Sequence, residues 1–271
     1  MDQADWTAAE LAGGELRLWL MEGGECITAS CGDDPGQTLC ALLLPILAQG
    51  QIMDVLACGW PGVEPVSVPC PPPPPAAPMA LDPGIRLHAV PGLVQDRPLD
   101  LLARAVPLIG GHLAAMPDFD GVLCLAGCPS AWVQISAGEV VSFRSFLTAE
   151  ILSALDAAPR DPFDKAAFTE TVAQAMSRPA SLAADLSSVR AGLALGRIED
   201  AAAWSRMAGL MIGAELAAAR PWWLGQNVVV IGESPLADRY ADALAAQGVI
   251  AARADPVRTW LEGMQAARRR P

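Results

Sequence analysis

The sequence has few of the side chains that commonly serve enzymes as nucleophiles, bases or phosphate-binding cations. Its 271 residues include two histidines, one tyrosine and a single lysine, Lys165. Neither His88 nor His112 lies in a recognisable nucleophile–base pattern, so we set aside Ser/His/Asp and Cys/His catalysis. With one lysine available, contacts to phosphate would have to come from arginine side chains or from backbone amides.

Long apolar runs and clustered positive charge are also missing. The richest apolar run, Leu39–Ala48, is interrupted by Pro45 and is shorter than the ~18 residues that a membrane helix needs. Asp2, Asp5 and Glu10 replace the basic start and apolar centre of a signal peptide. A net charge of −12 argues against nucleic acid, because phosphate neutralisation needs clustered cations. We therefore expect a soluble, cytoplasmic protein that has neither a membrane nor nucleic acid as a partner.

The seven cysteines do not have the spacing of a metal site. Cys124 and Cys128 are the closest suggestive pair, but no Cys/His quartet completes them. In a chain without export signals, an odd number of cysteines is typical of buried thiols rather than of a disulfide framework. The sequence therefore predicts neither a structural zinc site nor disulfides.

What the sequence does have is apolar material, at 52% of the residues, arranged in alternating strand and helix patterns. In the first half, residues 1–118, we expect a β-hairpin over Glu15–Glu22 and Glu25–Ser30 and a buried strand over Met53–Cys58. Leu99–Ala115 is expected to form a helix or a pair of short helices. The proline-rich segment 69–78 is predicted to form a stiff surface loop. The alternative is that it serves as a ligand for an SH3-like partner.

The second half, residues 119–271, begins with three predicted strands between Gly121 and Phe146, followed by a helix that Thr148 would cap. The turn at Gly127–Ser130 can be a phosphate cradle or an ordinary hairpin turn. A helical insertion comes next, and the chain closes as β-α-β-α. The whole is predicted to be an α/β protein with two sheet-centred halves.

Five short motifs occur in a defined order along the chain. They are Gly59-Trp60 with Glu64 and Val68–Pro71, Val90-Pro91-Gly92, Ser188-Val189-Arg190, Arg206–Glu215 and Gly232–Tyr240. Together they resemble the 2-dehydro-3-deoxygalactonokinase family over nearly the entire chain. The resemblance implies a two-domain actin-like (ribonuclease H-like) sugar kinase fold. It also implies phosphorylation of the 6-hydroxyl of 2-dehydro-3-deoxy-D-galactonate, with ATP and Mg²⁺ as cofactors.

The resemblance also implies positions for the site residues. Asp5 would hold the metal and, together with Glu150, act in catalysis. The expected nucleotide-binding residues are Gly127, Ser130, Gly209, Gly213, Gly232 and Glu233. The expected sugar-acid-binding residues are Gly59, Trp60 and Arg104. The expected partners are the sugar acid and ATP, and a homodimer is the assembly considered.

Three polar motifs of the family are altered in this chain. Against D-W-G-T-x-x-x-R, Asp5-Trp6 is followed by Thr7, where the family has glycine. Against R-G-E-E-T-Q, Arg104 is followed by apolar residues in place of both carboxylates. Against P-G-T-H-x-K-W-V, the segment Ala126–Val133 lacks the threonine, histidine and lysine.

Two functional hypotheses follow from these motifs. The first is a working sugar-acid kinase, supported by the order of the motifs. The second is a degenerate homologue, or pseudoenzyme, which keeps the fold and has a nucleotide- or sugar-acid-binding or regulatory role. Loss of one group that stabilises a transition state can lower a rate by ~10²–10³, so loss of several favours the second hypothesis.

Overall fold

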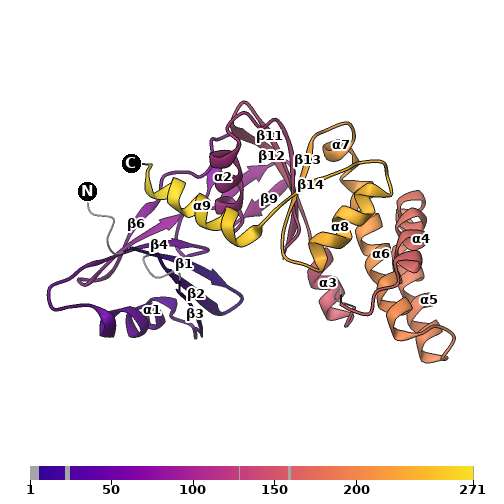
Figure 1. Cartoon of the computed structure of the whole chain (residues 1–271), viewed down its shortest axis with the longest axis horizontal. Coiled ribbons are helices and arrows are strands. Elements are labelled where there is room, and N and C mark those ends of the chain that lie inside the picture. Colours follow the sequence, from indigo (N-terminus) through magenta and orange to yellow (C-terminus); the bar gives the residue numbers. More distant parts are fainter. Residues whose placement is uncertain (1–5, 22–24, 128, 158–159, 271) are drawn as a thin grey trace. The chain divides into compact units, whose positions relative to one another are not determined.

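The chain divides into two compact units in the computed structural model (Figure 1), which describes residues 6–21, 25–127, 129–157 and 160–270. The first unit combines Met1–Phe119 with Gly138–Val140 and Val257–Pro271, and the second combines Asp120–Ala137 with Val141–Pro256. The predicted boundary between residues 118 and 119 lies next to this main division. The prediction placed the closing helix in the second half, however, whereas the structure places it in the first unit.

A mixed sheet with the strand order β3-β2-β1-β4-β7-β6 forms the centre of the first unit. Strands β1, β4 and β7 are parallel, β2 is antiparallel to β1, and β6 is antiparallel to β7. Alternation explains β2, because Leu16 and Leu18 are fully buried while Arg17 between them is partly exposed. The strands are β1 (Trp6–Ala12), β2 (Glu15–Leu20), β3 (Glu25–Ser30), β4 (Met53–Cys58), β6 (Ala77–Asp82) and β7 (Ile85–Val90).

The segment predicted as helical from Leu99 to Ala115 is partly a strand. Strand β9 (Leu99–Leu102) pairs antiparallel with β8 (Leu93–Asp96), and β8 also pairs with β5 (Val66–Ser67) in a small separate sheet. The helix α2 begins only at Val106, with Pro107 in its first turn, where proline costs no helical hydrogen bond. The predicted helix therefore extended too far toward the N-terminus.

The closing helix α9 (Pro256–Arg268) packs against α2 (Val106–Ala115) through glycines. A Cβ atom on Gly111 would overlap the carbonyl oxygen of Thr259, and one on Gly263 would overlap that of Pro107. These overlaps show that the two helix backbones lie close together at both glycines. This contact explains why α9 belongs to the first unit. The other helices of this unit are α1 (Pro35–Leu43) and the short 3₁₀ helix η1 (Leu44–Ile46).

The proline run is packed rather than free. Pro72, Pro73 and Pro74 are buried, and a Cβ on Gly110 of α2 would lie 2.6 Å from the ring of Pro73. A ligand for an SH3-like domain must present its prolines to the partner. The structure therefore favours the loop interpretation over the ligand interpretation.

The second unit repeats part of the first unit's strand order. Its sheet has the strand order β12-β11-β10-β13-β14. Strands β10, β13 and β14 are parallel, and β11 pairs antiparallel with β10. The first unit has the same arrangement in β1, β4 and β7, with β2 antiparallel to β1. All residues of β10 and β13 are buried, as expected for central parallel strands. The strands are β10 (Gly121–Leu125), β11 (Ser130–Ser136), β12 (Glu139–Phe146), β13 (Val228–Ile231) and β14 (Ala252–Ala254).

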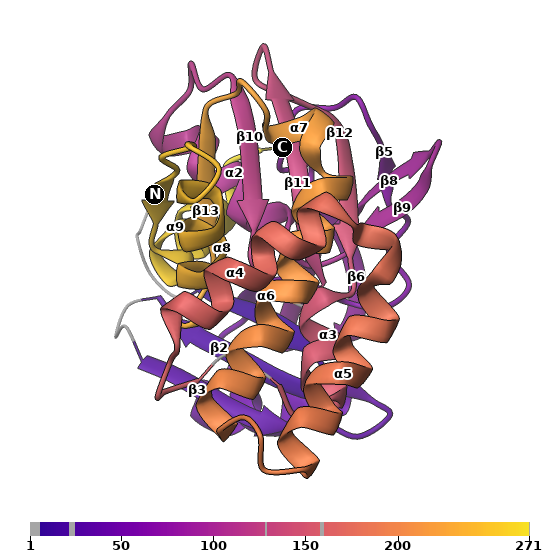
Figure 2. The same cartoon turned by 90° about the vertical axis from the view of Figure 1, so that its right-hand side faces the viewer.

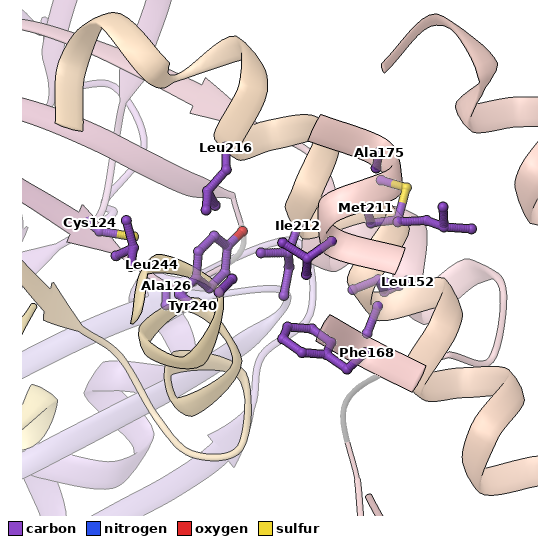
Figure 3. Close-up of a cluster of buried hydrophobic side chains, with 14 of the residues drawn as sticks. Cys124, Ala126, Leu152, Phe168, Ala175, Met211, Ile212, Leu216, Tyr240 and Leu244 are labelled. Carbon is purple, nitrogen blue, oxygen red and sulfur yellow. The ribbon is translucent and has the colours of Figure 1, made fainter. Parts of the chain in front are cut away.

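Helices pack on this sheet and on one another (Figure 2). They are α3 (Thr148–Ala154), α4 (Lys165–Ser177), η2 (Pro179–Ser181), α5 (Leu182–Ala194), α6 (Asp200–Ala218), α7 (Arg220–Trp223) and α8 (Leu236–Ala245). Figure 3 shows the apolar core of this unit, where Tyr240 of α8 lies near Ile212 and Leu216 of α6. Among the helices that the structure describes, none is long and apolar enough to cross a membrane.

Candidate functional site

The first candidate region is the edge of the first sheet at which the parallel strands end. The strand register pairs Glu10 of β1 with Cys58 of β4, and Cys58 with Val90 of β7. Open α/β sheets bind ligands outside the carboxyl ends of their parallel strands. Gly59 follows β4 and Gly92 follows β7 closely, so two of the motifs recognised in the sequence meet at this edge.

Glu10 offers a second placement, beside Asp5, for the carboxylate of the opening motif. In D-W-G-T-x-x-x-R the arginine comes seven residues after the aspartate, and Arg17 comes seven residues after Glu10. The two side chains approach to 3.9 Å across the β1–β2 pair. The turn between the strands is Gly13-Gly14, with φ of 57° and 80°, a conformation that favours glycine.

Asp5 lies outside the described residues, and Glu10 was missed by the comparison of motifs. That comparison matched the dipeptide Asp5-Trp6 and ignored the spacing to the arginine. The spacing, together with the Gly13-Gly14 turn signal, is present in the sequence. In this second register the acid is glutamate instead of aspartate, and glycine follows one position later than in the family motif.

Gly59 and Arg104 lie together at the same edge, as the prediction of a shared sugar-acid site requires. Gly59 has a φ of 76°, and a Cβ there would overlap the carbonyl oxygen of Leu11 and lie 3.0 Å from the Arg104 side chain. The Cys58 thiol donates a hydrogen bond to the Arg104 carbonyl oxygen at 3.2 Å. Burial raises the pKa of this thiol far above its usual range, so Cys58 is an inert buried group. Trp60 packs against the apolar core of the first unit.

The two carboxylates of the family's R-G-E-E-T-Q motif correspond to Val106 and Pro107, at the start of α2. Both residues are buried, and Val106 is 0% exposed. The first turn of α2, all of which the structure describes, contains no acidic residue. This segment therefore supplies no carboxylate to receive a proton from a sugar hydroxyl.

The second candidate region is the corresponding edge of the second sheet. Gly127 follows β10 and Gly232 follows β13, and the Ala126 amide donates to the Ile231 carbonyl at 2.8 Å. A Cβ on Gly232 would overlap the carbonyl oxygen of Ala126, so the close approach of these chains requires glycine. Glu233 is exposed beside Gly232. The structure thus brings Gly127, Gly232 and Glu233 to one edge.

Two other predicted nucleotide-binding glycines have a packing role. A Cβ on Gly209 would lie 2.5 Å from the Phe168 carbonyl oxygen, and one on Gly213 would lie 2.6 Å from that of Val172. Both glycines therefore face α4 and allow α6 to approach it closely. Their Cα atoms are covered by α4, so these positions are not open to a nucleotide.

A buried carboxylate, Glu215, accepts four hydrogen bonds inside the second unit. Its Oε2 accepts from Ser130 Oγ at 2.9 Å, from the Tyr240 hydroxyl at 2.7 Å and from the Thr148 hydroxyl, and its Oε1 accepts from Trp132 Nε1 at 2.8 Å. Glu215 is 3% exposed. Burial raises its pKa, and the four hydrogen bonds oppose that shift.

This cluster corrects two expectations from the sequence. Ser130 was predicted to bind nucleotide, but it is 0% exposed and its hydroxyl is engaged with Glu215 and with the Phe146 carbonyl. Thr148 was predicted to cap α3, but it is the first residue of that helix and its hydroxyl donates to Glu215. Sequence reasoning missed the cluster because its members come from separate motifs.

Glu150, the predicted catalytic residue of this unit, lies in the first turn of α3. It is partly buried, and its Oε2 is enclosed without a hydrogen-bond partner among the described residues. An acidic side chain at this position is also favourable because of the helix dipole. Glu150 is only two residues after Thr148 in sequence, but it is not one of the residues that bond to Glu215.

Among the described residues, no three His, Cys, Asp or Glu side chains gather as a ready-made metal site. Mg²⁺ is usually held by one or two carboxylates together with water and substrate phosphates, so a full protein cage is not required. Glu10, at the carboxyl end of β1, fits such a single-carboxylate contact.

Comparison with known proteins decides the family. Residues 11–267 match the sequence profile of the family described as 2-keto-3-deoxy-galactonokinase. The chain belongs to this family. A relative from Rhizobium meliloti (strain 1021), a probable 2-dehydro-3-deoxygalactonokinase, is 29% identical over 196 residues, or 68% of this chain. That match spans 64% of the relative's own length.

Solved structures confirm the predicted two-domain actin-like (ribonuclease H-like) α/β fold. A 2-dehydro-3-deoxygalactonokinase candidate from Sinorhizobium meliloti has a TM-score of 0.83 at 24% identity, covering 97% of this chain and 96% of that one. Component A of the (R)-2-hydroxyglutaryl-CoA dehydratase of Acidaminococcus fermentans has a TM-score of 0.50 at 11% identity, covering 96% and 95%. Within the chain, the sheets of the two units also resemble each other, because they share part of their strand order.

Proposed function

We propose that this member of the galactonokinase family is a degenerate cytoplasmic kinase that binds ATP and a sugar acid but transfers phosphate slowly or not at all. The sugar acid is 2-dehydro-3-deoxy-D-galactonate or a close analogue. The observation that carries the proposal is the pair Val106 and Pro107, both buried, where the family motif has two carboxylates. Binding and turnover are thereby separated, since the backbone elements of the two edges remain.

Each retained group has a role that its chemistry allows. Mg²⁺ bound to ATP would neutralise negative charge that develops during phosphoryl transfer. In the first unit, Glu10 would contact a magnesium ion, and Arg104 would pair with the carboxylate of the sugar acid. Amides near Gly127 and Gly232 would donate to phosphate oxygens. The exposed carboxylate of Glu233 lies at the same edge and would weaken phosphate binding.

The transfer step also needs a group that orients or deprotonates the attacking hydroxyl. Val106 and Pro107 have no acceptor side chain, and α2 offers no acid in its first turn. Loss of such groups typically lowers rates by ~10²–10³ each. We expect turnover well below the ~1–100 s⁻¹ that is typical of kinases.

The test compares binding and turnover in the same protein. ATP binding is measured by titration calorimetry with Mg²⁺, and turnover by a coupled assay with 2-dehydro-3-deoxy-D-galactonate. Saturable ATP binding with turnover at least ~100-fold below the typical range is the expected result. Turnover within that range would establish the alternative, a working sugar-acid kinase. If neither ATP nor the sugar acid binds, both the degenerate-kinase proposal and the working-kinase alternative are contradicted.

The role of Glu10 is tested with a matched pair of variants. Glu10→Gln removes the carboxylate at the end of β1, whereas Glu15→Gln removes an exposed carboxylate from the start of the neighbouring strand. We expect Glu10→Gln to weaken binding of Mg²⁺ about tenfold, or ~1.4 kcal/mol, and Glu15→Gln to leave it unchanged. Equal effects of the two variants would contradict a specific metal contact.

A further inference from the structure

The four donors to Glu215 come from different elements of the second unit. Ser130 and Trp132 are on β11, Thr148 is the first residue of α3, and Tyr240 is on α8. Glu215 itself is on α6. From its own helix α6, this one side chain therefore joins a strand and two further helices, and Ser130, the donor most distant from it in sequence, is 85 residues away.

Two of these donors lie at the carboxyl edge of the sheet. Strand β11 is antiparallel to β10, so its first residue, Ser130, lies where β10 ends. Strand β12 returns after the turn at Ala137-Gly138, so its last residue, Phe146, comes back to the same edge, and Ser130 Oγ lies 3.3 Å from the Phe146 carbonyl oxygen. Thr148 follows directly after this strand.

Close to these donors in sequence are Gly127, which is expected to bind nucleotide, and Glu150, which is expected to act in catalysis. Gly127 precedes Ser130 by three positions, and Glu150 follows Thr148 by two. Because Ser130 and Thr148 are bonded to the same carboxylate, the start of β11 and the first turn of α3 are held in a defined relation. Glu215 is 3% exposed, so it cannot itself contact a ligand at the surface.

The Glu215 side chain supplies the acceptor oxygens that this environment requires, because the four groups around it are donors. A carboxylate has acceptor sites only, and it can receive all four hydrogen bonds at once. Glutamine in the same place would direct an amide donor toward groups that are themselves donors. A shared buried acceptor of this kind imposes more geometric order than separate backbone contacts do.

We propose that Glu215 is a positioning residue, which sets the position of the start of β11 and of the α3 N-terminus and thereby controls nucleotide affinity. The inference rests on the proposed function in that nucleotide binding is one readout. Positioning of the two segments is a second readout that needs no ligand. The two can therefore fail separately.

The experiment uses the full-length chain in two measurements. The first is the dissociation constant for ATP with Mg²⁺, and the second is backbone hydrogen exchange of the unliganded protein. The test variant is Glu215→Gln. The control is Thr171→Val, which removes a buried hydroxyl that donates to the Ala167 carbonyl at 2.8 Å and has no contact with Glu215.

We expect Glu215→Gln to raise the ATP dissociation constant at least tenfold. It should also accelerate exchange of the amides around Gly127–Ala131 and Thr148–Ile151 more than elsewhere. Thr171→Val should leave the dissociation constant within about twofold and should not single out these segments. If both variants accelerate exchange uniformly and affect ATP equally, Glu215 has a role in folding alone and the proposal is overturned.

Milder variants keep the test decisive if Glu215→Gln does not fold. Ser130→Ala and Thr148→Val each remove one donor and leave the carboxylate in place. Each should raise the ATP dissociation constant about three- to tenfold and accelerate exchange in its own segment, and unchanged values would overturn the proposal. If the wild-type protein does not bind ATP, the proposed function fails, and the exchange pattern alone decides whether Glu215 positions these segments.

Discussion

The two units share part of their strand order, but they differ in which polar residues of the family motifs they retain. In the first unit, the positions of two family carboxylates hold Val106 and Pro107, and their chemistry is gone. In the second unit, the segment Ala126–Val133 has also lost a threonine, a histidine and a lysine, but Trp132 and Tyr240 retain their polar groups, which point inward to Glu215. Retention of a motif residue can therefore reflect the requirements of folding as much as those of catalysis.

The largest expected effect comes from breaking the inward polar cluster. Glu215→Leu would leave four buried donors without their acceptor, and loss of one partner from a buried charged network typically costs ~3–5 kcal/mol. We expect a clearly lowered midpoint in thermal unfolding followed by circular dichroism. The control Thr171→Val should cost ~1–3 kcal/mol. A Glu215→Leu protein as stable as wild type would show that the cluster contributes no stability.

A smaller effect is expected from crowding the α4–α6 contact in the same unit. Gly209→Ala places a methyl group against the carbonyl oxygen of Phe168, and overpacking of a core typically costs ~1–3 kcal/mol. Gly192→Ala in α5 is the matched control, because its Cβ would meet only the flexible Ile198 side chain, at 3.1 Å. We expect urea denaturation to show lower stability for Gly209→Ala alone. If ATP binding is lost without any loss of stability, Gly209 has a ligand role after all.

A third prediction concerns pH. Burial raises the pKa of Glu215 in the folded protein, so the folded state holds this proton at pH values where the unfolded chain has released it. The contribution of Glu215 to the unfolding free energy is therefore greatest below the ordinary glutamate pKa of about 4.3 and falls as pH rises through the folded pKa. Urea titrations of wild type and Glu215→Gln across this pH range should differ in slope. Parallel curves would contradict the raised pKa.

The smallest effect is expected at the surface of the second unit. The single lysine, Lys165, pairs with Asp242 at 2.8 Å and its side chain is 69% exposed. Exposed ion pairs contribute ~0–1 kcal/mol, so Lys165→Gln should change the unfolding free energy by less than about 1 kcal/mol. It should also leave ATP binding unchanged. A strong loss of binding would bring the one lysine into the functional site and would weaken the contrast between the two units.

Local sequence patterns were sufficient to predict much of the fold. The buried run at Val228–Ile231 and the alternation in Glu15–Leu20 each identify a strand, because burial on two faces or one leaves its own periodicity. Leu99–Leu102 escaped recognition, since four residues beside a helix carry too little periodic signal and pairing with β8 determines their conformation.

The candidate site was harder to predict, for a physical reason. Gly59 and Arg104 belong to two separate family motifs, and only the resemblance to the family assigned both of them to the sugar-acid site. The spacing from Glu10 to Arg17 was visible in the sequence, but a nearby Asp-Trp pair gave a competing match. The meeting of Ser130, Thr148 and Tyr240 at Glu215 depends on long-range packing, which leaves no local pattern.

The closing helix α9 has a consequence for synthesis of the protein on the ribosome. It covers the glycine face of α2, but it is made only after the whole of the second unit. The first unit therefore remains incomplete, and Gly111 of α2 lacks its contact with α9, until more than a hundred further residues have been synthesised. Its folding is thus completed after translation has passed the second unit, although most of its residues are synthesised first.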